Sequence, residues 1–483
     1  MTDLHLLSAA EMIARLKNGT VSPTEAVGAA YDRIEQVDLH INAMPTLCQG
    51  RAMAAAKAIE ADSHKNKARK DDPAWLAGLP VAVKDLVDVE GVRTTYGSPI
   101  YADHVPARSD IMVERLEKNG AIVIGKSNTP EFGAGGNTFN PVFPSTTTPW
   151  DTSLSAGGSS GGAASALAAG EVWLATGSDY GGSLRTPASF CGIVGLRPSP
   201  GRIANGPNPL PFGTMAVEGP MARTVQDTAI FLDAMVGKHP LDPLALGAPE
   251  TPFQTIVSSP SRPRRAAFSR NLGITPVDPD IADICEKAAE TLAAQGWEIT
   301  DDIPDFSTAM ETFHVIRAAS FAADMADLLE NNRHQLKPDN IWNIEKGLNQ
   351  NGADLAHAER ARGALYHRMA EFFTTHDLLL APTTCIPSFP VDWRCPEKLG
   401  DEHFENYMEW LRLPCVLSVT GCPVLSLPVG VTQNGLPIGM QFCGPHGGEH
   451  AVLSAAWHAE QVLEMVATVP RDPTPSVSRT PLP

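Results

Sequence analysis

Two glycine-rich segments each carry a serine that could act as a nucleophile or relay its proton. The first is Gly157-Gly158-Ser159-Ser160-Gly161-Gly162, and the second runs from Gly177 to Arg185 and contains Ser183. A third residue, Lys84, ends the apolar run Val81-Ala82-Val83. A serine hydroxyl needs a base at neutral pH, and a lysine can be that base only if burial or nearby charge keeps it neutral. Lys84, Ser159 and Ser183 together predict such a relay.

Ser183 is the expected nucleophile because two glycines precede it. Gly181 and Gly182 tolerate unusual backbone angles, so the amides from Tyr180 to Ser183 can point at one spot. Such an oxyanion hole stabilises the developing alkoxide, and each donor is worth roughly 3 kcal/mol. The alternative is a glycine turn that only lets a helix pack closely, and the accompanying Lys84 and Ser159 argue against it.

Lys84 is expected to act as the general base at the end of a buried strand, Leu79 to Lys84. The reference pKa of a lysine is about 10.4, whereas a general base works best nearer 7 to 8, a value that desolvation could provide. The alternative is a structural salt bridge from Lys84 to Asp85 or Asp179.

These segments closely resemble the amidase signature family. The resemblance runs from Leu79 to Pro198, is thin between about Gly201 and Asn271, and returns from Gly421 to Gly444. Its further motifs are Arg185-Thr186-Pro187-Ala188, Cys191-Gly192, Gly195-Leu196-Arg197-Pro198, Cys422-Pro423-Val424-Leu425-Ser426-Leu427-Pro428-Val429-Gly430 and Gly435-Leu436-Pro437-Ile438-Gly439.

The resemblance implies an α/β fold with a large twisted mixed β-sheet between helices. It also implies hydrolysis of amides and related acyl compounds, with Lys84 as the base, Ser159 as a bridging serine after a cis peptide bond, and Ser183 as the nucleophile. Gly133 and Ala134 should lie close to the scissile bond. Relatives include aryl acylamidases and carbamate-cleaving enzymes, so amides, esters and carbamates (urethanes) are the expected substrates. This chemistry needs no metal and no organic cofactor.

Four residues near the relay are expected to have supporting roles. Ser160 should provide a hydrogen bond without transferring a proton. Asp179 and Arg185 should fix the loop around the nucleophile through hydrogen bonds and an ion pair. Cys191 lies in an apolar turn without a nearby histidine, which predicts a buried structural thiol.

An apolar substrate is favoured by small residues near the scissile bond and by aromatic side chains that could line a pocket. These are Phe132, Phe139, Phe143, Trp150, Phe212 and Phe313. An alternative is the glutaminase component of a tRNA-dependent amidotransferase, which would need charged residues to hold glutamine. A second alternative is an α/β-hydrolase, because Gly157-x-Ser159-x-Gly161 fits its motif and His446, His450 and His458 follow. That motif must follow a strand, whereas residues 149–154 are predicted to form a loop.

The composition narrows the class of protein. With 37 basic and 55 acidic side chains the net charge is −18, which argues against nucleic-acid binding. The eight cysteines form no C-x-x-C pair, and no apolar run reaches the ~18 residues of a membrane span. We expect a cytoplasmic enzyme without a membrane anchor, with a small-molecule substrate; a homodimer stays open as its assembly state.

The chain is expected to form a single domain over residues 1–469. Its parts are N-terminal helices (1–75), a signature core (76–200), a variable loop and helical region (201–375) and a C-terminal core (376–469), followed by an extended, proline-rich tail (470–483). Capping boxes at Ser8 and Ser22 predict the first two helices. Residues 200–220 and 239–264 are predicted to be loops because they are rich in Pro, Gly, Asn and Ser.

Overall fold

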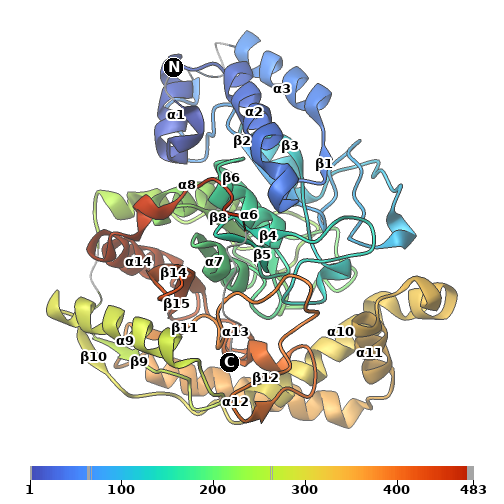
Figure 1. Cartoon of the computed structure of the whole chain (residues 1–483), viewed down its shortest axis with the longest axis vertical. Helices are drawn as coiled ribbons and strands as arrows, with labels where there is room; N and C mark the ends of the chain where they lie inside the picture. Colours follow the sequence, from blue (N-terminus) through green and yellow to red (C-terminus); the bar gives the residue numbers. More distant parts are fainter. Residues whose placement is uncertain (1–2, 63–65, 67, 261–262, 264, 476–483) are drawn as a thin grey trace.

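A mixed sheet of eleven strands lies at the centre of the part of the chain that the computed structural model describes, which is residues 3–62, 66, 68–260, 263 and 265–475. Strand β2 pairs in parallel with β3 and β6, whereas β14 and β15 pair antiparallel. Helices surround this sheet (Figure 1). The predicted α/β fold with a large mixed sheet is therefore confirmed.

The strands of the large sheet follow one another, from edge to edge, in an order unlike that of the sequence. This order is β1 (Thr46–Leu47), β3 (Ile122–Ser127), β2 (Pro80–Lys84), β6 (Leu174–Asp179), β8 (Val217–Ala222), β7 (Val194–Arg197), β14 (Val424–Val431), β15 (Pro437–Cys443), β11 (Leu378–Pro382), β9 (Arg265–Phe268) and β10 (Glu298–Thr300). Two short hairpins lie outside it, formed by β4 (Thr147–Thr148) with β5 (Asp151–Ser155) and by β12 (Lys398–Leu399) with β13 (Glu402–His403).

The helices range from short buried segments to long surface elements. They are α1 (Ala9–Asn18), α2 (Pro23–Ile41), α3 (Gln49–Ala61), α5 (Ile111–Lys118), α6 (Gly161–Ala169), α7 (Arg185–Cys191), α8 (Val225–Met235), α9 (Pro279–Ala294), α10 (Ala309–Asn332), α11 (Pro338–Leu348), α12 (Gly352–Phe372), α13 (Arg412–Val419) and α14 (Glu449–Leu463). Helices α10 and α11 lie side by side at the lower right of Figure 1. Among the described residues, no helix combines the length and the apolar character needed to cross a membrane.

The two capping boxes start α1 and α2 as predicted. The Ser8 hydroxyl accepts a hydrogen bond from the Glu11 amide, while the Glu11 carboxylate accepts one from the Ser8 amide. Ser22 and Glu25 repeat this arrangement at the start of α2, where Pro23 occupies the first helical position. Each box satisfies amides that would otherwise lack partners at a helix N-terminus.

Helices α6 and α7 connect the two serine segments to the core. Every residue of both helices is buried. Helix α6 contacts β2, β3, β6 and β8, and α7 contacts β7, β14 and β15. Because α6 begins immediately after Ser160 and α7 immediately after Leu184, their packing fixes both glycine-rich turns against the sheet.

Two predicted loops contain regular structure. Residues Asp151–Ser155 form β5, so the prediction of a loop over 149–154 is wrong. This strand pairs with β4 and forms a single bridge from Leu154 to Pro390, outside the large sheet. The predicted loop over 200–220 ends in β8, whose Pro220 lies opposite Thr176 of β6. Pairing with strands on both sides outweighs the low strand preference of Gly219 and Pro220.

The segment 239–264 and the proline-rich tail also differ in part from the prediction. The segment 239–264 contains a short 3₁₀ helix at Phe253–Val257, although residues 261, 262 and 264 lie outside the described part. The first part of the proline-rich tail packs on the body, because Thr474 exchanges backbone hydrogen bonds with Pro149 and Thr152. Residues 476–483 also lie outside the described part.

Candidate active site

Lys84 lies at the end of β2 with no solvent exposure, and three serine hydroxyls surround its amine. Its Nζ lies 2.8 Å from Ser159 Oγ, 2.8 Å from Ser160 Oγ and 3.0 Å from Ser178 Oγ. Burial lowers the pKa of Lys84 to about 7, although the nearby carboxylates of Glu218 and Asp179 favour the charged form. A neutral amine is therefore accessible near neutral pH.

The salt bridge considered as an alternative for Lys84 does not form among the described residues. Asp85 pairs instead with Lys126, with 3.4 Å between Oδ1 and Nζ. Asp179 pairs with Arg185 at 3.0 Å and with Arg197 at 3.2 Å. The hydrogen bonds of Lys84 are directed at hydroxyl groups, as a relay requires.

Ser159 and Ser160 lie at the N-terminal end of α6, and the peptide bond between Gly158 and Ser159 is cis. Ser160 accepts a hydrogen bond from Lys84, and its own hydroxyl lies 3.4 Å from the Ser178 carbonyl oxygen, to which it donates. These contacts agree with the supporting role expected for Ser160.

Ser183 lies in the turn between β6 and α7, next to the other two serines. Its carbonyl oxygen accepts a hydrogen bond of 3.2 Å from the Ser160 amide. Its side chain is half-buried, and within the described residues its hydroxyl forms no hydrogen bond. The backbone thus brings Ser183 beside the Lys84–Ser159 pair and leaves its hydroxyl available to a ligand.

The turn before Ser183 provides fewer free amides than the sequence predicted. The Gly182 amide donates to Asp179 Oδ1 at 2.8 Å, which contradicts its expected role as a free oxyanion donor. The amides of Tyr180, Gly181 and Ser183 form no hydrogen bond within the described residues. A Cβ atom at Gly181 would lie 2.6 Å from the Phe313 ring, so the close packing of α10 requires glycine there.

Asp179 and Arg185 fix this turn, as predicted. Asp179 accepts hydrogen bonds from the amides of Gly182 and Leu184 and from the guanidinium groups of Arg185 and Arg197. Burial raises the pKa of Asp179, but the two arginines outweigh burial and hold it well below its ordinary value. A charged, fully buried network therefore supports the backbone that carries Ser183.

The two predicted substrate-binding residues have different environments. A Cβ atom at Gly133 would lie 3.5 Å from Ser159 Oγ, so Gly133 borders the bridging serine. Ala134 is buried, its methyl group packs beside Phe321, and its carbonyl oxygen accepts a hydrogen bond from Lys337. Ala134 therefore shapes the wall behind Gly133, and its contact with substrate stays a prediction.

A cavity of about 1220 Å³ opens beside the nucleophile turn. Tyr180, which belongs to this turn, lines the cavity. Leu86 also lines it, and a Cβ atom added to Gly133 would lie 2.9 Å from Leu86 Cδ1, so the cavity extends close to Gly133. Of the aromatic residues named from the sequence, Phe132 and Phe212 line it. Other apolar walls, which the sequence did not reveal, come from Tyr96, Tyr101, Met215, Ile316, Phe321 and Met325.

The other predicted aromatic residues have different surroundings. The Trp150 indole donates to the Cys191 carbonyl oxygen. The ring of Phe139 lies under Lys337, and that of Phe143 under Arg93. Cys191 is buried as predicted, and burial raises the pKa of its thiol to about 12.

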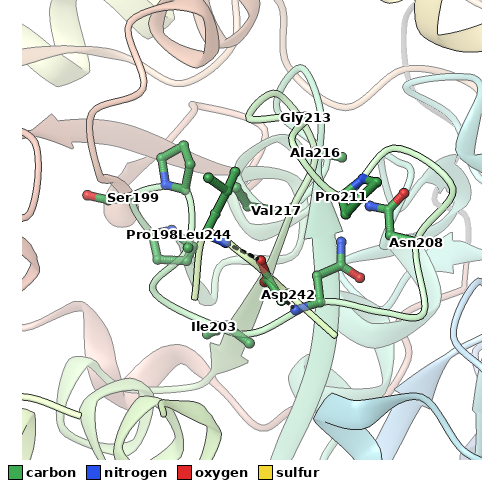
Figure 2. Close-up of a pocket in the computed structure, with 13 residues that line it drawn as sticks. Pro198, Ser199, Ile203, Asn208, Pro211, Gly213, Ala216, Val217, Asp242 and Leu244 are labelled. Atoms are coloured by element: carbon green, nitrogen blue, oxygen red, sulfur yellow. Dashed lines mark hydrogen bonds between the residues drawn. The ribbon is translucent and has the colours of Figure 1, made fainter. Parts of the chain in front are cut away.

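A second, much smaller cavity lies behind the loop that follows Pro198 (Figure 2). Its volume is about 20 Å³, enough for roughly one water molecule. The Asp242 carboxylate at its edge accepts hydrogen bonds from the amides of Asn205 and Leu244, drawn as dashed lines in Figure 2. These bonds give Asp242 a structural role in folding the loop.

The histidines that an α/β-hydrolase would use have other partners. His450 lies 3.3 Å from Thr255 Oγ1, His458 lies 3.2 Å from Trp297 Nε1, and His446 packs edge-on against Tyr366. The hydrogen-bond partner of Ser159 is Lys84. The α/β-hydrolase alternative is therefore wrong.

Comparisons with known proteins identify the family of this chain. The sequence profile of the Amidase family matches residues 25–453. The chain is 34% identical to an acylamidase of Rhodococcus erythropolis over 97% of this chain and 98% of the relative. It is 33% identical to a glutamyl-tRNA(Gln) amidotransferase component of Moorella thermoacetica over 96% of this chain and 98% of the relative.

A solved structure of similar fold supports membership of the same family. The crystal structure of a bacterial aryl acylamidase of the amidase signature family superposes with a TM-score of 0.87 and 26% identity, covering 97% of this chain and 99% of that one. By sequence and by fold, this chain belongs to the amidase signature family and is an amidohydrolase.

Proposed function

We propose that Ser183 attacks the carbonyl carbon of a hydrophobic amide while Ser159 and Lys84 remove its proton. The observation that carries this proposal is the contact of 2.8 Å between the buried Lys84 amine and Ser159 Oγ. A buried lysine that forms no ion pair with a carboxylate among the described residues and is surrounded by hydroxyl groups is suited to work as a neutral base.

In the proposed reaction, Ser183 forms a bond to the acyl carbon as its proton passes to Ser159 and the Ser159 proton passes to Lys84. The carbonyl oxygen becomes an alkoxide that the free amides of Tyr180, Gly181 and Ser183 stabilise. Return of the proton through Ser159 allows the C–N bond to break and the amine to leave. Water then attacks the acyl-enzyme by the same proton path, which releases the acid and restores Ser183.

The substrate is proposed to carry an aryl or aliphatic group beside the scissile bond. Support comes from the apolar cavity, whose walls include Phe132, Tyr180, Ile316 and Phe321. Binding such a group removes apolar surface from water. The same attack would serve esters and carbamates, because they present the same kind of carbonyl carbon.

The purified chain is expected to hydrolyse a hydrophobic anilide and to leave glutamine unchanged. The test is a panel of aryl amides, alkyl amides, esters, carbamates and glutamine, with release of amine or acid measured for each. Lys84→Ala serves as the control for catalysis by the proposed relay. Turnover of glutamine without turnover of any hydrophobic amide would favour the glutaminase function of the amidotransferase relatives instead.

The pH dependence provides a second prediction. Because only the neutral amine of Lys84 can accept a proton, kcat/KM should fall as the pH drops below about 7, where the amine becomes protonated. Initial rates between pH 5 and pH 9 would measure this fall of kcat/KM, which is the acid limb of the pH profile. A rate independent of pH across this range would contradict the assignment of Lys84 as the base.

A further inference from the structure

The carboxylate of Glu131 lies inside the protein and joins three segments of the chain. Glu131 has no solvent exposure and begins the short 3₁₀ turn Glu131–Gly133. Its Oε1 atom accepts a hydrogen bond of 2.7 Å from the Ser98 hydroxyl. Its Oε2 atom accepts one of 2.7 Å from the Lys337 amide and one of 2.8 Å from the Asn340 side chain, both at the start of α11. The carboxylate therefore fixes the turn to the Ser98 segment and to α11.

The segments that Glu131 joins build one side of the apolar cavity. Tyr101 ends the short 3₁₀ helix that begins after Ser98, and Phe132 follows Glu131 directly; both rings line the cavity. Phe321 lines it from α10, which packs along α11. One buried carboxylate thus connects the parts of the wall that would face a bound apolar group.

The backbone of Phe132 depends on these contacts. Its φ is +49°, in the left-handed region that residues other than glycine rarely adopt. Such a conformation persists only where the surrounding structure enforces it. The Phe132 amide donates a hydrogen bond of 2.8 Å to the Tyr96 carbonyl oxygen, and its ring packs edge-on against Tyr101 with 6.1 Å between the ring centres. Glu131 on one side and Tyr96 on the other therefore hold the Phe132 ring in the cavity wall.

We propose that Glu131 is a positioning residue that holds the Phe132 ring against the apolar group of the substrate. The partners of its carboxylate are Ser98, Lys337 and Asn340, so it acts on the substrate only through Phe132. This inference rests on the proposed function, because it takes a hydrophobic amide as the substrate. It adds that the affinity for such an amide depends on a buried carboxylate outside the cavity.

The test is the hydrolysis of octananilide, whose aryl group and long acyl chain can fill the cavity, by Glu131→Gln. Glutamine offers one acceptor oxygen and adds a donor, so it cannot satisfy all three donors that face Glu131. We expect KM to rise about 10-fold with kcat almost unchanged, because the ring contacts the bound substrate equally before and during the reaction. Ser98→Ala keeps the carboxylate but removes one donor, and should raise KM about 3-fold.

A double-mutant cycle shows whether Glu131 acts through Phe132. Phe132→Ala should itself raise KM about 10-fold, because it removes apolar contact with the substrate. Adding Glu131→Gln to Phe132→Ala should raise KM no further, since the ring to be positioned is gone. The dissociation constant of octananilide should follow the same pattern when each substitution is placed in Ser183→Ala and binding is measured by calorimetry, a measurement that needs no turnover.

Asp227→Asn is the matched control for the loss of a buried carboxylate. Asp227 is fully buried on α8 and accepts hydrogen bonds of 3.0 and 2.9 Å from the amides of Ala9 and Ala10. Its substitution should lower the melting temperature, as Glu131→Gln should, but it should leave KM and the dissociation constant unchanged. A purely structural role of Glu131 would make the two variants behave alike.

An unchanged KM and dissociation constant in the folded Glu131→Gln and Ser98→Ala variants would overturn this inference and leave the proposed function in place. A full further increase when Glu131→Gln is added to Phe132→Ala would do the same. If Glu131→Gln does not fold, Ser98→Ala decides the question. Normal turnover by Lys84→Ala would instead refute the proposed function, and the dissociation constants would still decide the role of Glu131.

Discussion

Replacing Ser183 by alanine is expected to lower kcat by about 10⁴-fold or more, because no other group can form the bond to the acyl carbon. The Ser183 hydroxyl is half-buried and free of protein hydrogen bonds within the described residues, as a nucleophile awaiting a substrate should be. The neighbouring Ser159 already engages Lys84 at 2.8 Å, so it cannot take the place of Ser183 without losing its own proton path.

Ser160→Ala provides a close comparison. Ser160 lies as near to Lys84 as Ser159 does but is assigned only a supporting hydrogen bond, so its loss should cost about 10- to 100-fold. Incubation with a fluorophosphonate, followed by mass spectrometry of the intact protein, would measure formation of the serine adduct. We expect the adduct in Ser160→Ala and none in Ser183→Ala. Ordinary turnover by Ser183→Ala would rule out this nucleophile.

The three residues of the proposed relay could be selected from the sequence because local features mark them. Lys84 is conspicuous at the end of an apolar strand, and glycines surround Ser159 and Ser183. Helices α1 and α2 were predicted for the same reason, since a capping box is contained within four residues.

Features that depend on distant pairings were not predicted. Strand β8 contains Gly219 and Pro220, which disfavour a strand, and it forms only because β6 and β7 lie on either side. The opposition of Glu218 and Ser178 follows from that pairing and has no signature in the sequence. The hydrogen bond from the Gly182 amide to Asp179 could not be predicted either, because residue types do not reveal the direction in which a backbone N–H group points.

The walls of the apolar cavity illustrate the same limit. Leu86, Phe212 and Phe321 lie far apart in the sequence and meet only in the folded chain. An aromatic side chain such as Trp150 has the right chemistry for a pocket, yet its indole is used to hold the Cys191 carbonyl oxygen. Side-chain type therefore suggested an apolar substrate, whereas the identity of the lining depended on tertiary packing.

Asp179→Asn is expected to lower the free energy of unfolding by about 3 to 5 kcal/mol, because it leaves two buried guanidinium groups without their counter-charge. Arg185 and Arg197 are both fully buried and both pair with Asp179. Arg185 also donates to Gln441 and Ser418, so the network joins β6, α7, α13 and β15 around the nucleophile turn.

Urea unfolding followed by circular dichroism would measure this change at pH 7. The pKa of Asp179 is lowered in the folded state, so its contribution to stability is fully present above the unfolded pKa of about 4 and disappears only at lower pH. Asp283→Asn is the matched control, because Asp283 pairs with Arg270 at 2.6 Å on the surface, where solvent screens the interaction. Equal effects of the two substitutions would show that the buried network stabilises the fold no more than a surface ion pair does, whereas a much larger loss for Asp179→Asn would show that the stability of the fold depends on this buried carboxylate.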